Sequence, residues 1–140
     1  MTGTFKKYVL LSFFLAGISI VLHSCIPRLE SAYDVSDLKI EKKLNGTLIW
    51  FKAQKRIDGT EAFVSQSNWL IITIPHASID LNKINSVQPS GIIGKIETER
   101  FESSVQISMK LTDKVGKVEV VRHPQTNDIY VNVLTPQENR

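Results

Sequence analysis

The chain has 140 residues, of which 42% are hydrophobic and 22% charged, with 17 Lys+Arg against 14 Asp+Glu. Lys6 and Lys7 are the only charged residues before position 25, so the remainder carries 15 basic and 14 acidic side chains, a net charge of +1. Nucleic-acid binding requires a clustered basic face, and this near-neutral balance argues against such a partner. The residues after position 24 are enough for one domain and too few for two.

The N-terminal segment has the pattern of an export signal. Lys6 and Lys7 precede an almost wholly apolar run of 15 residues at 8–22 (YVLLSFFLAGISIVL). A transmembrane helix needs about 20 apolar residues, so this run is short for a permanent span. A basic head, an apolar centre of this length and the small residue Ser24 at its end are typical of a secretory signal peptide. We therefore expect residues 1–24 to be a cleaved signal.

Cys25 is the only cysteine, so it has no partner within the chain for a disulfide or a shared metal. The sequence Leu22-His23-Ser24-Cys25 resembles the lipobox of bacterial lipoproteins, except that His23 stands where a small or aliphatic residue is commoner. The resemblance implies cleavage before Cys25 and acylation of the new N-terminus. Two or three acyl chains, at about 0.8 kcal/mol per buried CH₂, anchor a protein firmly. The alternative is a secreted protein with a chance cysteine.

Localisation follows from the same resemblance. Ile26 stands where some bacterial lipoproteins have an aspartate that retains them at the inner membrane. The resemblance therefore implies a lipoprotein of the outer membrane, facing the periplasm. Residues 26–36 (IPRLESAYDVS) have no clear period, so residues 25–36 are interpreted as the lipidated N-terminus and a tether.

From Asp37 onward the pattern has a period of two, which is typical of β-strands. Asn45-Gly46 is a strong hairpin signal, and Asp58-Gly59 is a second turn signal. We interpret the apolar run 69–74 (WLIITI), which Pro75 ends, as a strand buried on both faces. Further strands are expected at 37–43, 47–56, 61–66, 92–101, 104–111, 117–123 and 129–134, and a short helix is the alternative to a loop at 77–87.

Short strands separated by frequent turn signals predict an all-β fold, a small β-sandwich of about seven strands over residues 37–134. Residues 135–140 are expected to form a C-terminal tail. Trp50 and Trp69 each lie inside an apolar run, so we expect them in the core, in preference to a sugar-binding platform.

The sequence offers little for catalysis. His76 and His123 have no cysteine or carboxylate at metal-ligand spacing, so neither a metal nor another cofactor is expected. No nucleophile elbow or comparable signature is present. Glu97, Glu99 and Glu102 are interpreted as a solvated strand face with cross-strand ion pairs, in preference to a glycosidase pair. We therefore expect no enzymatic activity.

The order of elements over 69–134 resembles the AMIN domain, a small β-sandwich attached to periplasmic cell-wall amidases and to type IV pilus secretins. The resembling pattern is an apolar strand ending in proline (WLIITIPHASI), a glycine-led strand ending near Phe101, an alternating strand (SVQISMKL) and two closing strands. The resemblance extends over residues 37–134 and implies peptidoglycan binding. Thr73 and Gln106 depart from it, because the family often has an aspartate and an arginine at these two positions.

Three functional hypotheses follow. The first is a lipid-anchored envelope module that binds peptidoglycan, a secretin or another envelope protein, with Arg100, Gln106 and Arg122 as candidate ligand-binding residues. The second is a structural accessory lipoprotein that pairs an unprotected sheet edge with a partner's strand. The third and most distant is an enzyme with two facing carboxylates.

Overall fold

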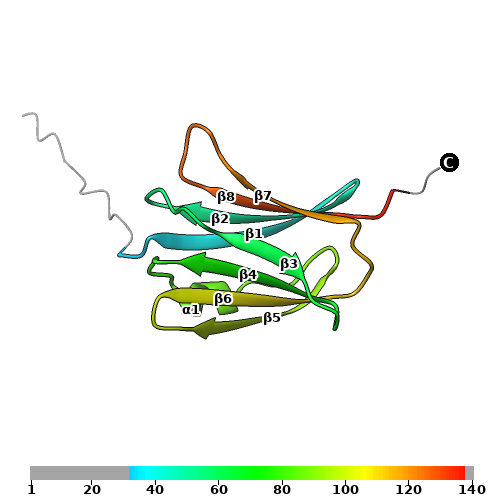
Figure 1. Cartoon of the computed structure of the whole chain (residues 1–140), viewed down its shortest axis with the longest axis horizontal. Coiled ribbons are helices and arrows are strands. Elements are labelled where there is room, and N and C mark those ends of the chain that lie inside the picture. Colours follow the sequence, from blue (N-terminus) through cyan, green and yellow to red (C-terminus); the bar gives the residue numbers. More distant parts are fainter. Residues whose placement is uncertain (1–31, 138–140) are drawn as a thin grey trace, which may run out of the picture.

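A computed structural model describes residues 32–137, which form eight β-strands and one short helix (Figure 1). The expected signal peptide, Cys25 and most of the expected tether lie outside the described residues. The strands form two four-stranded antiparallel sheets, so the predicted all-β sandwich is confirmed, with eight strands in place of about seven. Within residues 32–137, no helix is both long and apolar enough to cross a bilayer.

Each sheet contains four strands, and the two sheets take their strands from different parts of the chain. Sheet A has the order β1 (Val35–Lys43), β2 (Gly46–Ala53), β8 (Ile129–Leu134), β7 (Lys117–Arg122). Sheet B has the order β3 (Glu61–Val64), β4 (Trp69–Pro75), β6 (Ser104–Leu111), β5 (Ile93–Arg100). The helix, α1 (Leu81–Asn85), follows β4.

The core lies between the sheets and is built from alternate residues of each strand. Along β6, Val105, Ile107, Met109 and Leu111 are buried while the residues between them are partly exposed, as the sequence predicts. Burial of such side chains at about 25 cal/mol per Å² is the main stabilising contribution. The facing layer is supplied by sheet A, through Ile49, Phe51, Ile129, Val131 and Val133.

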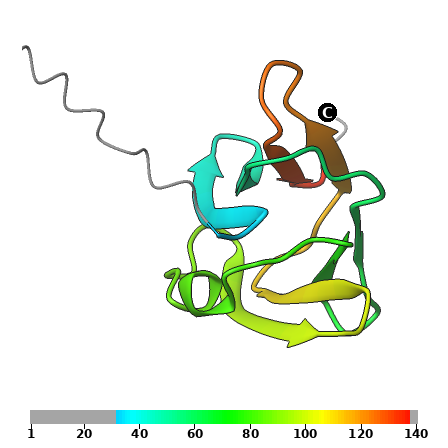
Figure 2. The same cartoon turned by 90° about the vertical axis from the view of Figure 1, so that its left-hand side faces the viewer.

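The two long sides of the sandwich are closed differently (Figure 2). On one side α1 packs against β1 and β5, with Asp80 as its N-cap and its own residue Ile84 fully buried. There the N–H of Val35 also donates to the carbonyl of Ser78 at 3.0 Å. On the other side β3 and β7 approach each other, but they belong to separate sheets and no strand pairing joins them within residues 32–137. This second side is called the seam below.

Several element boundaries differ from the sequence prediction, and three of the differences are informative. The first strand begins at Val35, which is fully buried, two residues before the expected start. The helix occupies only Leu81–Asn85 of the expected 77–87. The predicted hairpin exists, but its loop is Leu44 and Asn45, and Gly46 is the first residue of β2. A Cβ atom on Gly46 would lie 2.1 Å from the carbonyl oxygen of Val133, so the glycine is required by the close approach of β8.

Candidate functional site

The outer face of sheet A carries an aromatic residue that the sequence placed in the core. Along β2 the buried side chains are Thr47, Ile49, Phe51 and Ala53, so Trp50 points outward and is only partly buried. Trp69 likewise lies on the outer face of sheet B. The prediction of two core tryptophans was wrong, because an apolar run such as LIWF conceals the two-residue alternation of a strand with only one face in the core.

Three rings lie next to one another on the outer face of sheet A. Trp50 and Tyr130 are register partners on β2 and β8, with ring centroids 6.0 Å apart and an interplanar angle of 77°. The His123 ring lies 5.7 Å from that of Tyr130 at 84°. Such edge-to-face pairs are favourable by about 0.5–1.5 kcal/mol beyond the area they bury. Trp50, Tyr130 and His123 are called the aromatic row below.

The aromatic row continues on the neighbouring strands. Lys39 on β1 is the register partner of Trp50, and its Nζ lies 4.8 Å from the centre of the indole ring. Val121 on β7 pairs with Tyr130 and is 43% exposed. The line from Lys39 to Val121 therefore crosses all four strands of sheet A with one cation, two aromatic rings and an exposed aliphatic group.

Asp128, which lies at the end of the β7–β8 turn, holds the indole ring of Trp50 in place. This residue is only 8% exposed, and its carboxylate accepts from Trp50 Nε1 at 2.9 Å and from the N–H of Ala53 at 3.1 Å. A buried carboxylate that accepts two hydrogen bonds holds both donors in place. The sequence does not reveal this role of Asp128, because its partners on β2 are more than seventy positions away.

His123 is held at the other end of the same turn. Its Nδ1 accepts hydrogen bonds from the backbone N–H groups of Gln125 and Thr126, at 3.2 and 3.1 Å. With Nδ1 acting as an acceptor, the proton of the neutral imidazole is assigned to Nε2. A ligand lying over Tyr130 therefore meets a ring of fixed orientation.

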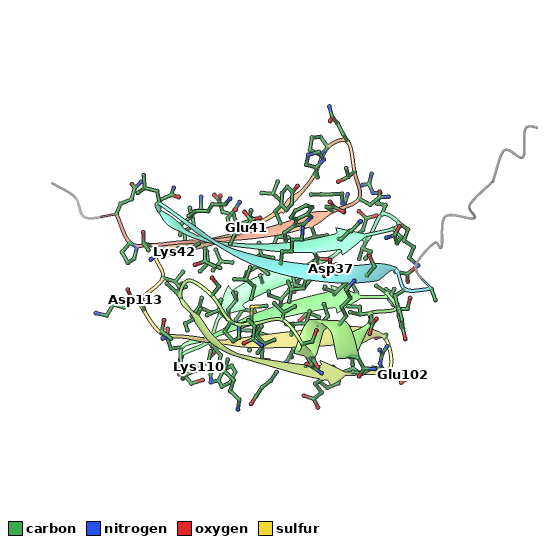
Figure 3. All side chains as sticks on the ribbon, turned by 180° about the vertical axis from the view of Figure 1, so that it is seen from behind. Asp37, Glu41, Lys42, Glu102, Lys110 and Asp113 are labelled. Carbon is green, nitrogen blue, oxygen red and sulfur yellow. The ribbon has the colours of Figure 1, made fainter. Side chains whose placement is uncertain are left out.

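A second row, with three polar residues and one leucine, lies beside the aromatic row on the same face. The register aligns Glu41, Leu48, Asn132 and Glu119 across β1, β2, β8 and β7. A hydrogen bond from Lys43 lowers the pKa of the Glu41 carboxyl, so this group is an anionic acceptor at neutral pH. Figure 3 shows Glu41 on sheet A and Lys110 on sheet B, which belong to different faces of the sandwich. The outer face of sheet A thus combines flat rings with hydrogen-bonding groups.

The three candidate residues named from the sequence do not converge. Arg100, at the end of β5, donates from Nη2 to the carbonyl of Ile79 at 3.0 Å beside α1. Gln106 lies on the outer face of sheet B and donates to Ser108 Oγ at 3.2 Å. Arg122 lies on β7 at the seam, where it donates to the carbonyl of Ile57 at 2.8 Å. Each belongs to a different region, so the sequence did not identify a single site.

The outer face of sheet B carries a smaller apolar surface. Phe63 is 55% exposed and is the register partner of Ile71. The Nζ of Lys110 lies 5.4 Å from the centre of the Trp69 ring and donates to the carbonyl of Ser67 at 2.7 Å. This face has no fixed aromatic pair among the described residues, in contrast to the face of sheet A.

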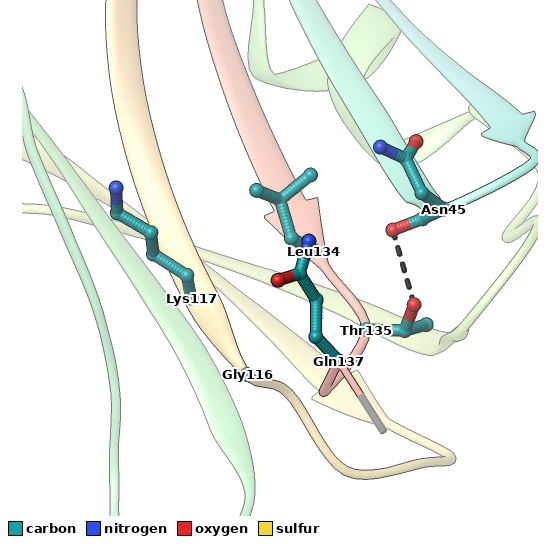
Figure 4. Close-up of a pocket in the computed structure, with 6 residues that line it drawn as sticks. All are labelled: Asn45, Gly116, Lys117, Leu134, Thr135 and Gln137. Atoms are coloured by element: carbon teal, nitrogen blue, oxygen red, sulfur yellow. Dashed lines mark hydrogen bonds between the residues drawn. The ribbon is translucent and has the colours of Figure 1, made fainter. Parts of the chain in front are cut away.

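A hollow of about 440 Å³ lies at the end of the fold where the described chain finishes (Figure 4). Thr135 closes one wall of this hollow by donating to the carbonyl of Asn45 at 3.1 Å. Lys117 is the one titratable residue among its described lining, and it is paired with Glu119. The hollow therefore offers little specific chemistry.

Neither a model of a known protein family nor a curated protein sequence matches this chain. Among residues 32–137, no group of three or more His, Cys, Asp or Glu side chains is placed to hold a metal ion. The functional assignment therefore rests on the geometry of the outer faces and of the seam.

We predict that Asp128→Asn destabilises the fold by about 1–3 kcal/mol, because the amide cannot accept from both Trp50 and Ala53 without presenting a donor to one of them. Urea unfolding followed by tryptophan fluorescence measures this change. Asp113→Asn is the matched control, since Asp113 is an exposed loop carboxylate, and we expect it to change stability by less than about 0.5 kcal/mol. Equal stability of the two variants would contradict the role given to Asp128.

Proposed function

We propose that this protein is a lipid-anchored, non-catalytic binding module of the bacterial cell envelope, and that it holds peptidoglycan with the outer face of sheet A. The observation that carries the proposal is the set of adjacent rings Trp50, Tyr130 and His123 on that face. Tyrosine and tryptophan side chains are enriched among the residues that contribute most of the binding energy at protein interfaces.

The chemistry of the face suits a glycan in particular. Sugar rings present apolar C–H faces that stack on aromatic rings, and hydroxyl groups at their edges that need donors and acceptors. The aromatic row supplies the first contact, and Asn132, Glu119 and Glu41 in the adjacent row supply the second. An open sheet face of four strands also accommodates a polymer, whereas a closed pocket accommodates only its end.

The position of the expected anchor is compatible with this use of the sheet face. Cys25 precedes the first described residue, Ala32, by a stretch of chain that can span at most about 25 Å. The strands run between the end of the domain that holds Val35 and the opposite end (Figure 1). A lipid on Cys25 therefore tethers one end of the strands to the membrane and leaves both outer faces accessible from the side.

The two residues that depart from the AMIN pattern lie next to each other in the structure. Thr73 and Gln106 are register partners on β4 and β6, on the outer face of sheet B. An aspartate and an arginine at these positions would form a cross-strand ion pair, and here both are replaced by uncharged side chains. A paired replacement supports the resemblance, and it also favours sheet A over sheet B as the binding face in this chain.

A second candidate function is recognition of a partner protein by strand pairing at the seam. Val120 and Val121 on β7 are 37% and 43% exposed, and β7 contains a single lysine and no proline. Edges with these properties are able to pair with an added strand. In contrast, α1 covers the side between β1 and β5.

We predict that residues 26–140 co-sediment with purified peptidoglycan sacculi at moderate salt, and that Tyr130→Thr weakens this retention about tenfold or more, as for an aromatic residue at the centre of a binding face. Phe63→Thr, which removes an exposed ring from sheet B, is the matched control and should leave retention unchanged. A wild-type protein that stays in the supernatant would exclude direct wall binding and favour a protein partner.

We also predict that Cys25→Ser moves the full chain from the membrane fraction to the soluble fraction of a bacterial host, because an acylated cysteine is the proposed anchor. Metabolic labelling with a radioactive fatty acid should mark the wild-type protein and not the variant. An unlabelled wild-type protein would leave an ordinary secreted domain as the correct interpretation.

A further inference from the structure

The seam leaves one strand edge of sheet A open. β7 is the last strand of its sheet, and within residues 32–137 no other strand pairs with its second side. The edge strands β1 and β5 lie beside α1, and the edge strand β3 has only four residues. Among the described edges, β7 is therefore the longest one that α1 does not flank.

The register with β8 decides which main-chain groups of β7 face this edge. His123 donates its N–H to the carbonyl of Asp128 at 2.9 Å, and the same pairing continues along the two strands. Because hydrogen-bonded and non-hydrogen-bonded residues alternate in an antiparallel pair, the N–H and C=O groups of Val118, Val120 and Arg122 point away from β8. A row of such donors and acceptors is what an added strand pairs with.

β7 has few of the features that protect an edge strand from pairing. It contains no proline, its one lysine, Lys117, is paired with Glu119, and the Arg122 guanidinium is bound to the loop after β2. The pairing with β8 has no register shift, so no bulge bends this edge away. Val120 and Val121 are 37% and 43% exposed, and they lie on opposite faces of the strand. An added strand would cover part of both.

The sequence of β7 is complementary to itself in the antiparallel direction. A two-fold axis perpendicular to the sheet keeps the same face outward in both copies, so a residue can oppose only residues that lie on its own face. With the axis at Val121, the two Val121 side chains meet, and Glu119 of each copy lies opposite His123 of the other. This places a carboxylate acceptor beside an imidazole whose proton is on Nε2. The N–H and C=O groups of Val120 and Arg122 in one copy then pair with those of Arg122 and Val120 in the other.

The expected lipid anchor is compatible with such a pair. The register across sheet A places Arg122, Ile129 and Phe51 at the end of the sheet that also holds Val35. An axis at Val121 therefore lies toward the end of each domain where the chain enters it. A pair of strands this short buries less surface than a standard protein interface, so the association is weak. Lipid anchors that confine two copies to one membrane raise their effective concentration and make weak pairing sufficient.

We propose that two copies of this protein pair antiparallel through β7, with Val121 on the two-fold axis, so that their two A sheets form one continuous sheet. This inference rests on the second candidate function, strand pairing at the seam, and it assigns a second copy of the chain as the partner. Because the axis is perpendicular to the sheet, the aromatic rows of both copies lie on the same outer face. A single polymer then meets two binding faces, and its retention rises without any new kind of contact.

The first test is disulfide crosslinking of residues 26–140, which contain every buried core residue and no cysteine. Val121→Cys places two thiols opposite each other in a non-hydrogen-bonded pair, where the Cα atoms lie about 4.5 Å apart and a disulfide can form. With oxidised glutathione as the oxidant, we expect this variant to form covalent dimers about tenfold faster than Phe63→Cys, because pairing raises the local thiol concentration. Phe63 is the matched control, since it is 55% exposed on β3. Equal rates for the two variants would overturn the proposal.

The second test is sedimentation velocity of residues 26–140 over a range of concentrations. We expect the average sedimentation coefficient to rise with concentration, and Val121→Lys to weaken the association about tenfold, because it sets two ammonium groups opposite each other. Phe63→Lys should leave the association unchanged. A coefficient that stays that of a monomer up to about 1 mM, where the weakest specific pairs form, would overturn the proposal. So would a full-length Val121→Cys variant that crosslinks in bacteria only to a different protein, which would leave strand pairing intact with another partner. Neither test uses sacculi, so their failure and the failure of wall binding are distinguishable.

Discussion

The two-residue alternation of each strand is the constraint on which the rest of this structure depends. Each sheet must bury one set of side chains against the other sheet, so whatever stands between two buried positions is placed on an outer face. Ile49 and Phe51 are buried, and Trp50 between them is therefore outward. A shift of β2 by one residue would exchange these faces and remove both the core contacts and the aromatic row.

The same constraint explains what could be predicted from the sequence. The alternation of 104–111 and the turn signals near positions 45 and 59 were sufficient for the fold class, because they depend on neighbours in the chain. The placement of Trp50 and Trp69 was not predictable from their apolar runs, since burial depends on which face meets the opposite sheet. The missing cue was the spacing itself: Ile49, Phe51 and Ala53 form an inward set that leaves Trp50 on the other side.

The candidate sites were harder to predict from the sequence than the fold, because they are formed by contacts between residues far apart in the chain. Asp128 joins the β7–β8 turn to two donors on β2, and Arg122 joins β7 to the loop after β2. Arg122 was named from the sequence as a candidate ligand-binding residue, whereas the structure places it at the seam, where its guanidinium donates to the loop after β2. Turn and strand propensities describe neither arrangement.

The aromatic row and the seam both lie next to the turn between β7 and β8. Outward residues next to this turn reach the aromatic row, and inward residues reach the seam, so His123 and Arg122 serve different surfaces although they are adjacent. The proposed lipid on Cys25 would hold the domain at this end and leave the outer face of sheet A accessible from the side.

The most direct test of the central claim is to map the binding face by NMR, with soluble glycan strands from purified peptidoglycan whose peptides have been removed. The account predicts shifts concentrated at Lys39, Leu48, Tyr130 and Asn132, on the outer face of sheet A. Shifts concentrated at Phe63 and Gln106 on sheet B, or no shifts anywhere, would contradict it.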